Sequence, residues 1–225
     1  ALFAHCFTCS KDLKAAGWIS RALVERRIAV FRFDFTGIGE SAGDFENTNF
    51  SSNLQDLEAA AEYLRREHEA PKILVGHSLG GAAVLAAAAS IPEAVAVATI
   101  GAPSDTEHLK DTLLRQAPEL EELDQAEVTL GGRSFRIKQQ LLRDLESGHM
   151  QGAISSLGKA LLIFHSPVDD IVHVDHARRI YMAAKHPKSF VSLDDADHLL
   201  SRQSDARYVG EVLAAWAGRY VETGE

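Results

Sequence analysis

Short apolar segments alternate along this chain with longer segments that carry one apolar stripe, and this alternation limits the folds open to it. The short segments have the composition of strands buried on both faces of a sheet. They span Leu2–His5, Ile28–Phe33, Lys72–Val75, Ala94–Ile100, Ala160–His165 and Ser189–Leu193. The longer segments have helical spacing and span Leu13–Arg26, Asn53–Glu67, Leu79–Ser90, Val174–Ala184 and Asp205–Tyr220. Alternating strands and helices predict an α/β fold with a mostly parallel, doubly wound sheet.

One long segment, Ser104–Gly158, interrupts this alternation. It holds two helical patterns, at Thr106–Gln116 and Phe135–Leu145. Between them lies the pair Gly131–Gly132 with apolar flanks, which is typical of a hairpin turn. No repeat or linker divides the 225 residues, and a chain of this length suits a single core. We therefore expect one domain that covers the whole chain, with an inserted cap at about residues 104–158.

Composition excludes some classes of function. The net charge of −9 argues against a nucleic-acid binder, which needs a basic face. No apolar stretch reaches the roughly 18 residues of a membrane-spanning helix, and the N-terminus lacks the regions of a signal peptide. These absences, with only two cysteines, predict a cytoplasmic protein without a disulfide framework. Because a strand begins at Leu2, we also expect that strands are missing before it.

The sequence Gly76–His77–Ser78–Leu79–Gly80 matches the pattern G-x-S-x-G and stands between a predicted strand and a predicted helix. In that context the serine occupies a strained turn, and the glycines let the strand and helix approach each other closely. The hydroxyl then projects from the sheet at a helix N-terminus, where negative charge is favoured. Ser78 is therefore the candidate nucleophile, and the alternative is an ordinary turn in which Ser78 caps the helix.

A serine hydroxyl needs a base to take its proton, and the base needs an acid to orient it. The loop after Ala160–His165 supplies two candidate acids, Asp169 and Asp170, and the last strand is followed by His198. The strands deliver all of these groups to one edge of a parallel sheet. We favour Asp169, four residues after His165, and leave Asp170 as the alternative.

Other features near the predicted site have alternative explanations. Three carboxylates before His198 are typical of a turn and alternatively of a metal site: Asp194, Asp195 and Asp197. Since a catalytic triad of serine, histidine and aspartate needs no metal, we expect neither a metal nor a cofactor. A tetrahedral intermediate needs backbone N–H donors, and we expect them at Leu79 and Phe7.

The two cysteines lie in the same loop as Phe7. Cys6 and Cys9 form a C-x-x-C pattern, which next to a strand–helix turn is either a redox motif or part of the lining of the active-site loop. We favour the lining. In either case Cys6 is expected close to Ser78.

These residues resemble the α/β-hydrolase superfamily, in which the chain order is Ser, acid, His. The segment FDFTGIGESAGDF resembles its D-x-x-G-x-G-x-S turn, and the similarity covers the whole chain. More narrowly, six segments resemble the hydrolase half of proteins fused to an OsmC-type domain: HCFTCSKD, FDFTGIGESAGDF, TNFSSN, ATIGAP, GGRSFRI and HSPVDDIV. The resemblance implies an α/β-hydrolase fold, esterase-like activity on short acyl chains and a natural chain that continues into an OsmC-type, peroxide-reducing domain. Cys6 departs from the glycine that is common at its position.

The function predicted is a serine hydrolase that cleaves small-molecule carboxylic esters through an acyl-enzyme. A thioesterase or a peptidase is a near alternative, because the nucleophile motif does not separate these substrates. The alternative from another class is a non-catalytic or thiol-redox module that works with an OsmC-type domain, suggested by the two cysteines.

Overall fold

The computed structural model of the chain describes residues 1–130, 132–146 and 149–221. Six strands form one sheet in the order β2-β1-β3-β4-β7-β8, and each neighbouring pair is parallel. The strands are β1 (Leu2–Ala4), β2 (Phe31–Arg32), β3 (Ile73–His77), β4 (Ala96–Ile100), β7 (Ala160–His165) and β8 (Lys188–Ser192). The predicted parallel sheet is confirmed. The segment predicted as Ile28–Phe33 shortens to two paired residues because β2 lies at the edge and pairs only with β1.

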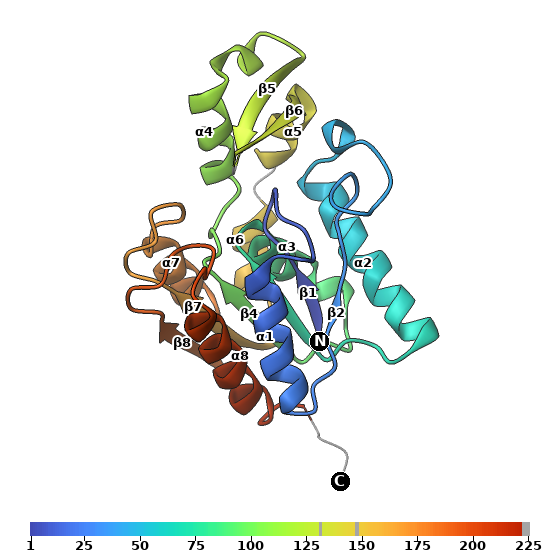
Figure 1. Cartoon of the computed structure of the whole chain (residues 1–225), viewed down its shortest axis with the longest axis vertical. Coiled ribbons are helices and arrows are strands. Elements are labelled where there is room, and N and C mark those ends of the chain that lie inside the picture. Colours follow the sequence, from blue (N-terminus) through green and yellow to red (C-terminus); the bar gives the residue numbers. More distant parts are fainter. Residues whose placement is uncertain (131, 147–148, 222–225) are drawn as a thin grey trace.

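Helices cover both faces of the sheet (Figure 1). On one face, α1 (Lys14–Glu25) and α8 (Gln203–Ala217) pack against each other and against the strands. The other face is covered by α2 (Phe50–Glu67), α3 (Leu79–Ala87), α6 (His149–Ser155) and α7 (Asp175–Ala183). Short 3₁₀ turns lie at Phe45–Asn47, Ala88–Ser90 and Pro118–Glu121. Of the helices in the described part of the chain, none combines the length and apolarity needed to cross a bilayer.

The first part of the segment between β4 and β7, which ends with α5 (Gln139–Leu145), forms a small lobe beyond the carboxyl ends of the strands (Figure 1). It contains α4 (Glu107–Gln116), the antiparallel pair β5 (Gln125–Leu130) and β6 (Arg133–Lys138), and α5. The predicted hairpin is present, with Gly131 outside the described residues. The lobe is tied to the core by the bond from the Asn49 side chain to Gln140, of 2.6 Å, and by the ion pair between Lys138 and Glu46.

The predicted helix Phe135–Leu145 is wrong over its first residues. Phe135 and Ile137 are buried, whereas Ser134 and Arg136 are exposed, so the burial repeats every two residues. Arg133–Lys138 is therefore a strand paired with β5, and the helix begins only at Gln139. Pairing with β5 decides that this segment is a strand, because the spacing of apolar residues in so short a segment fits a strand and a helix equally well.

Candidate active site

The turn between β3 and α3 holds Ser78 in a conformation that side chains rarely adopt. Its φ is +55° and its ψ is −124°, and its N–H donates to the carbonyl of Ile100 at 2.8 Å. A Cβ on Gly76 would lie 2.2 Å from the carbonyl oxygen of Gly80, so glycine is required where the strand and helix cross. The Ser78 side chain makes no capping hydrogen bond to α3, which removes the helix-cap alternative.

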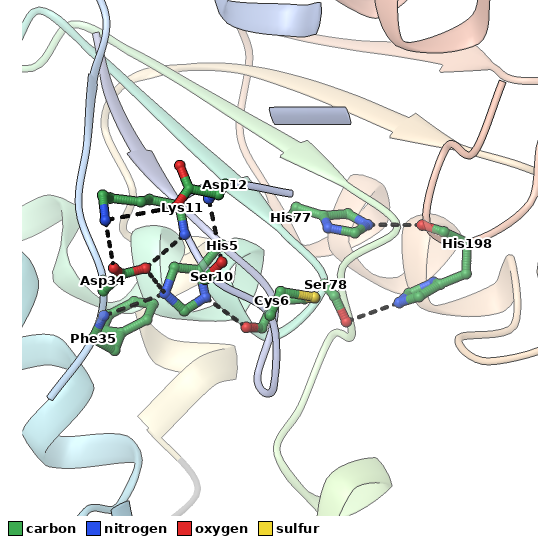
Figure 2. Close-up of a disulfide and its surroundings, with 11 residues drawn as sticks. His5, Cys6, Ser10, Lys11, Asp12, Asp34, Phe35, His77, Ser78 and His198 are labelled. Atoms are coloured by element: carbon green, nitrogen blue, oxygen red, sulfur yellow. Dashed lines mark hydrogen bonds and ion pairs between the residues drawn. A yellow bond between two sulfur atoms is a disulfide. The ribbon is translucent and has the colours of Figure 1, made fainter. Parts of the chain in front are cut away.

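The Ser78 hydroxyl instead faces His198, which follows β8. The distance from Ser78 Oγ to His198 Nε2 is 2.9 Å, and His198 Nδ1 lies 2.8 Å from Asp169 Oδ2. Since a carboxylate only accepts, Nδ1 carries the proton and Nε2 accepts from the hydroxyl. The three side chains thus form a continuous chain of hydrogen bonds in which the serine faces a free ring nitrogen. Figure 2 shows the half of this chain that joins Ser78 to His198.

The carboxylate next to His198 belongs to Asp169. Its other oxygen, Oδ1, accepts from the backbone N–H groups of Ile171 and Val172 at 2.9 and 2.8 Å. Burial favours the neutral acid, but these bonds and the one from His198 outweigh it, so the pKa of Asp169 lies below its ordinary value. The neighbouring Asp170 has an exposed side chain. The structure therefore brings Asp169 to His198 and leaves Asp170 in solvent.

Two further residues lie next to His198: one binds its backbone, and the other leaves room for its ring. The Nε2–H of His77 donates to the carbonyl oxygen of His198 at 2.7 Å (Figure 2), and burial lowers the pKa of His77 to about 4, so this ring stays neutral. Gly101, after β4, has a φ of +54°, and a Cβ there would lie 3.2 Å from Asp169 Oδ2 and 3.3 Å from His198 Nδ1. Sequence reasoning missed Gly101, although a glycine directly after a strand at the site's edge was a usable signal.

The two backbone donors expected to bind an oxyanion lie on neighbouring segments. Leu79 begins α3, and its N–H has no partner within the helix. Phe7 lies in the loop after β1, and in the part of the chain that the structure describes neither N–H makes a hydrogen bond. A Cβ on Gly80 would lie 2.4 Å from the carbonyl oxygens of Ala4 and His5, which places the end of β1 directly against the start of α3.

A small pocket of about 10 Å³ lies where these two segments meet. Its walls are mostly apolar and include Phe7, Phe35, Phe45, Leu79 and Ala83. Phe7 contacts Phe45 with 5.4 Å between ring centroids. Phe45 contacts a residue of the β6 strand, Phe135, at 4.9 Å. A row of three aromatic rings therefore connects the loop after β1 to the lobe.

The turn after β2 anchors the same loop through Asp34. Its carboxylate accepts from the backbone N–H and the ammonium group of Lys11 at 2.7 and 2.9 Å, and from the N–H of Glu40 at 3.0 Å. Burial opposes the charge of Asp34, but these donors outweigh it and hold its pKa below the ordinary value. A Cβ on Gly39 would lie 2.3 Å from this carboxylate, so the glycine makes room for it.

The carboxylates for which a metal was the alternative do not converge. Asp195 pairs with Arg202 at 2.7 Å, and Asp197 accepts from the backbone N–H of Ser201 at 2.9 Å. Among the described residues, no group of three or more His, Cys, Asp and Glu side chains forms a metal site. The cysteines, in contrast, do meet, because Cys6 and Cys9 form a disulfide.

Comparison with known proteins places these features in a wider group. Residues 1–212 match the sequence model of the Alpha/beta hydrolase family. The crystal structure of the esterase domain of a Rhodothermus marinus protein is 51% identical and superposes with a TM-score of 0.77, over 97% of this chain and 86% of that one. Mouse alpha/beta hydrolase domain-containing protein 10 superposes with a TM-score of 0.80 at 21% identity, over 97% and 89% of the two chains. The second likeness concerns the fold alone.

A curated relative is the human mitochondrial palmitoyl-protein thioesterase ABHD10. It is 26% identical over 190 residues, which are 80% of this chain and 57% of that protein. The chain spans about half the length of the curated relatives it matches. The comparisons leave the fused OsmC-type domain as a prediction from the sequence.

Proposed function

Because the chain belongs to the alpha/beta hydrolase family, we propose that it is a serine hydrolase that cleaves carboxylic esters of small acyl groups through Ser78, His198 and Asp169. The observation that carries this proposal is the unbroken hydrogen-bonded chain, with contacts of 2.9 and 2.8 Å on the two ring nitrogens of His198. It aligns a nucleophile, a base and an orienting acid.

In the first half of the proposed reaction, His198 Nε2 takes the proton of the Ser78 hydroxyl while its oxygen attacks the ester carbonyl carbon. The oxyanion that forms is stabilised by the free N–H groups of Leu79 and Phe7. Asp169 stabilises the imidazolium. The proton then passes from His198 to the alcohol oxygen, the ester C–O bond breaks, and the alcohol leaves an acyl group on Ser78.

The second half repeats these steps with water. His198 takes a proton from a water molecule, whose oxygen attacks the acyl carbon. The bond to Ser78 Oγ then breaks as that oxygen regains its proton from His198, and the carboxylic acid departs. Because Nε2 has to be unprotonated at the start of each half, activity is expected to fall at acidic pH.

The pocket beside the proposed oxyanion site has mostly apolar walls and a volume of about 10 Å³, and so small a space favours a small acyl group over a long one. The 51% identical domain is called an esterase domain, which also favours an ester. A thioester is the second candidate, because ABHD10 is a palmitoyl-protein thioesterase. Rates with p-nitrophenyl acetate, p-nitrophenyl butyrate, acetyl and palmitoyl thioesters and a p-nitroanilide separate the esterase, thioesterase and peptidase possibilities.

The test of the nucleophile is covalent labelling with a serine-directed fluorophosphonate, located by mass spectrometry, alongside turnover of p-nitrophenyl acetate. The label is expected on Ser78, and Ser78→Ala should lose both label and turnover. Ser104→Ala is the matched control. Ser104 is also buried and lies 3.0 Å from a histidine, His176, but that ring nitrogen already accepts the N–H of Ser104. Turnover that survives in Ser78→Ala, or a label found at Ser104, would overturn the proposal.

A further inference from the structure

The cysteine pair in the loop after β1 takes no part in the proposed reaction. Cys6 and Cys9 are the only cysteines of the chain, and they are joined as a disulfide across a Cα–Cα distance of 5.2 Å. That separation lies within the usual range for disulfides. Figure 2 shows the Cys6 side chain on the side of its loop that faces Ser78.

The two ends of this loop are held by contacts that do not involve sulfur. At the first end, the His5 ring donates to the Cys6 carbonyl oxygen at 2.7 Å and accepts from the Phe35 N–H at 3.2 Å. At the other end, Lys11 is bound twice to the carboxylate of Asp34. Neither anchor involves a sulfur atom, and Figure 2 shows both of them.

The middle of the loop is held differently. The Cys9 N–H donates to the Cys6 carbonyl oxygen at 3.2 Å, and the disulfide closes the same short ring. Phe7 and Thr8 are the two residues inside that ring. The free N–H of Phe7 is one of the two proposed oxyanion donors, so the disulfide encloses a group whose position matters for catalysis.

We propose that Cys6 and Cys9 form a thiol–disulfide exchange site, and that the disulfide state holds the Phe7 N–H where it stabilises the oxyanion. This inference rests on the proposed esterase function. The exchange site would react with dithiols and disulfides, either as small molecules or as parts of proteins. The loop keeps its anchors at His5 and Lys11 when the disulfide opens, whereas the segment that carries Phe7 gains freedom. Since a cross-link that closes so short a loop adds less to global stability than one that closes a long loop, reduction changes the site and leaves the sheet folded.

The exposure of the sulfurs sets the order of the exchange. Cys6 is only 6% exposed, whereas Cys9 is partly exposed. The thiolate of an external dithiol therefore attacks Cys9 Sγ, the bond to Cys6 Sγ breaks, and Cys6 leaves as a thiolate that takes up a proton. The second thiolate of the reagent then attacks the reagent sulfur that is bonded to Cys9 Sγ. This breaks the mixed disulfide and releases Cys9 as a thiolate, which also takes up a proton. The protein gains two electrons and two protons, and the dithiol becomes a disulfide.

The experiment compares the full chain after treatment with oxidised glutathione and after treatment with dithiothreitol, each followed by removal of the reagent. Alkylation with N-ethylmaleimide, counted by mass, should modify neither cysteine in the first sample and both in the second. The ratio kcat/KM for p-nitrophenyl acetate should fall at least about tenfold on reduction. The fall is bounded by the roughly 10²–10³-fold effect of losing a whole oxyanion donor. Reoxidation should restore the rate.

The double variant Cys6→Ala, Cys9→Ala is the matched control. It should show the rate of the reduced protein in both treatments. Equal rates for the oxidised and reduced chain, no alkylation after dithiothreitol, or a double variant with the rate of the oxidised chain would each overturn the inference. Reduction that unfolds the sheet, seen by circular dichroism, would overturn it as well. If neither the oxidised nor the reduced chain turns over substrate and Ser78 takes no phosphonate label, the esterase proposal itself fails. Equal turnover in both states overturns only the exchange-site inference and leaves the esterase proposal standing.

Discussion

Replacing Asp169 by asparagine is a sharp test of the site, because the structure dictates how the new side chain would lie. Oδ1 of Asp169 accepts from two backbone N–H groups, those of Ile171 and Val172. In Asp169→Asn those donors retain the amide oxygen at the same place. The amide NH₂ group is then turned toward His198 Nδ1, which has to accept instead of donate.

That reversal moves the imidazole proton to Nε2, the nitrogen that lies 2.9 Å from Ser78 Oγ. A protonated Nε2 cannot take the proton of the hydroxyl. The equivalent change in a chymotrypsin-type triad lowers kcat by about 10⁴-fold, which corresponds to about 5 kcal/mol of transition-state stabilisation. We expect a loss of this size in kcat, with KM for p-nitrophenyl acetate nearly unchanged.

The control is Asp170→Asn. It removes an identical charge from the next residue along the chain, whose side chain is exposed. Its kcat/KM should stay within about twofold, because surface changes away from the site have small effects. The assay is initial-rate hydrolysis of p-nitrophenyl acetate, with urea unfolding to show that both variants fold. If Asp169→Asn keeps more than about a tenth of the activity, or if Asp170→Asn loses as much as Asp169→Asn, the tautomer argument is refuted.

Three further predictions concern the surroundings of the site. His77 has a pKa of about 4 in place of 6.5, so the unfolded chain takes up a proton that the folded chain refuses. Stability should therefore fall by up to about 3 kcal/mol between pH 6.5 and 4, and urea titrations of His77→Gln should show a correspondingly weaker pH dependence. Gly101→Ala places a Cβ at a φ of +54° and 3.2 Å from Asp169 Oδ2; it should cost about 1–2 kcal/mol of stability and at least about tenfold in kcat/KM, and full activity would show that the site tolerates the Cβ. Asp34→Asn weakens the contacts that hold Lys11 and should lower the free energy of unfolding by about 1–3 kcal/mol, whereas an unchanged urea midpoint would argue against Asp34 as the anchor of the loop.

Sequence patterns predicted the sheet well because buried parallel strands have a strong apolar signal. The segment Ala160–His165 was predicted with the bounds that the structure has. The prediction was less accurate for helix starts that are set by side-chain hydrogen bonds. Helix α2 begins at Phe50, three residues before the predicted start, because Asn49 and Ser52 form reciprocal capping bonds of 2.8 and 2.9 Å. Periodicity follows apolar residues and does not register a polar cap.

The order of the candidate groups along the chain was enough to nominate Ser78 and His198. Each follows a strand, and parallel strands bring their carboxyl ends to one edge. The sequence favoured Asp169 over Asp170 only by its spacing from His165, because no local pattern shows which of two neighbouring carboxylates contacts a distant histidine. In the structure only the first of them meets His198 and two backbone donors. That contact depends on the path of a loop and on a ring that lies 29 residues further along the chain.

The sequence by itself therefore determined the elements of the parallel sheet, their order and the edge where the chemistry gathers, because these follow from apolar periodicity and from the geometry of parallel strands. Tertiary structure alone decided which atoms meet there. Three features depend on distances between segments remote in sequence: the bond from the buried His77 to the His198 backbone, the narrow space at Gly101 beside the triad, and the bonds that anchor the loop after β1 to Asp34 and Phe35. Such distances are set by packing, which no local pattern encodes.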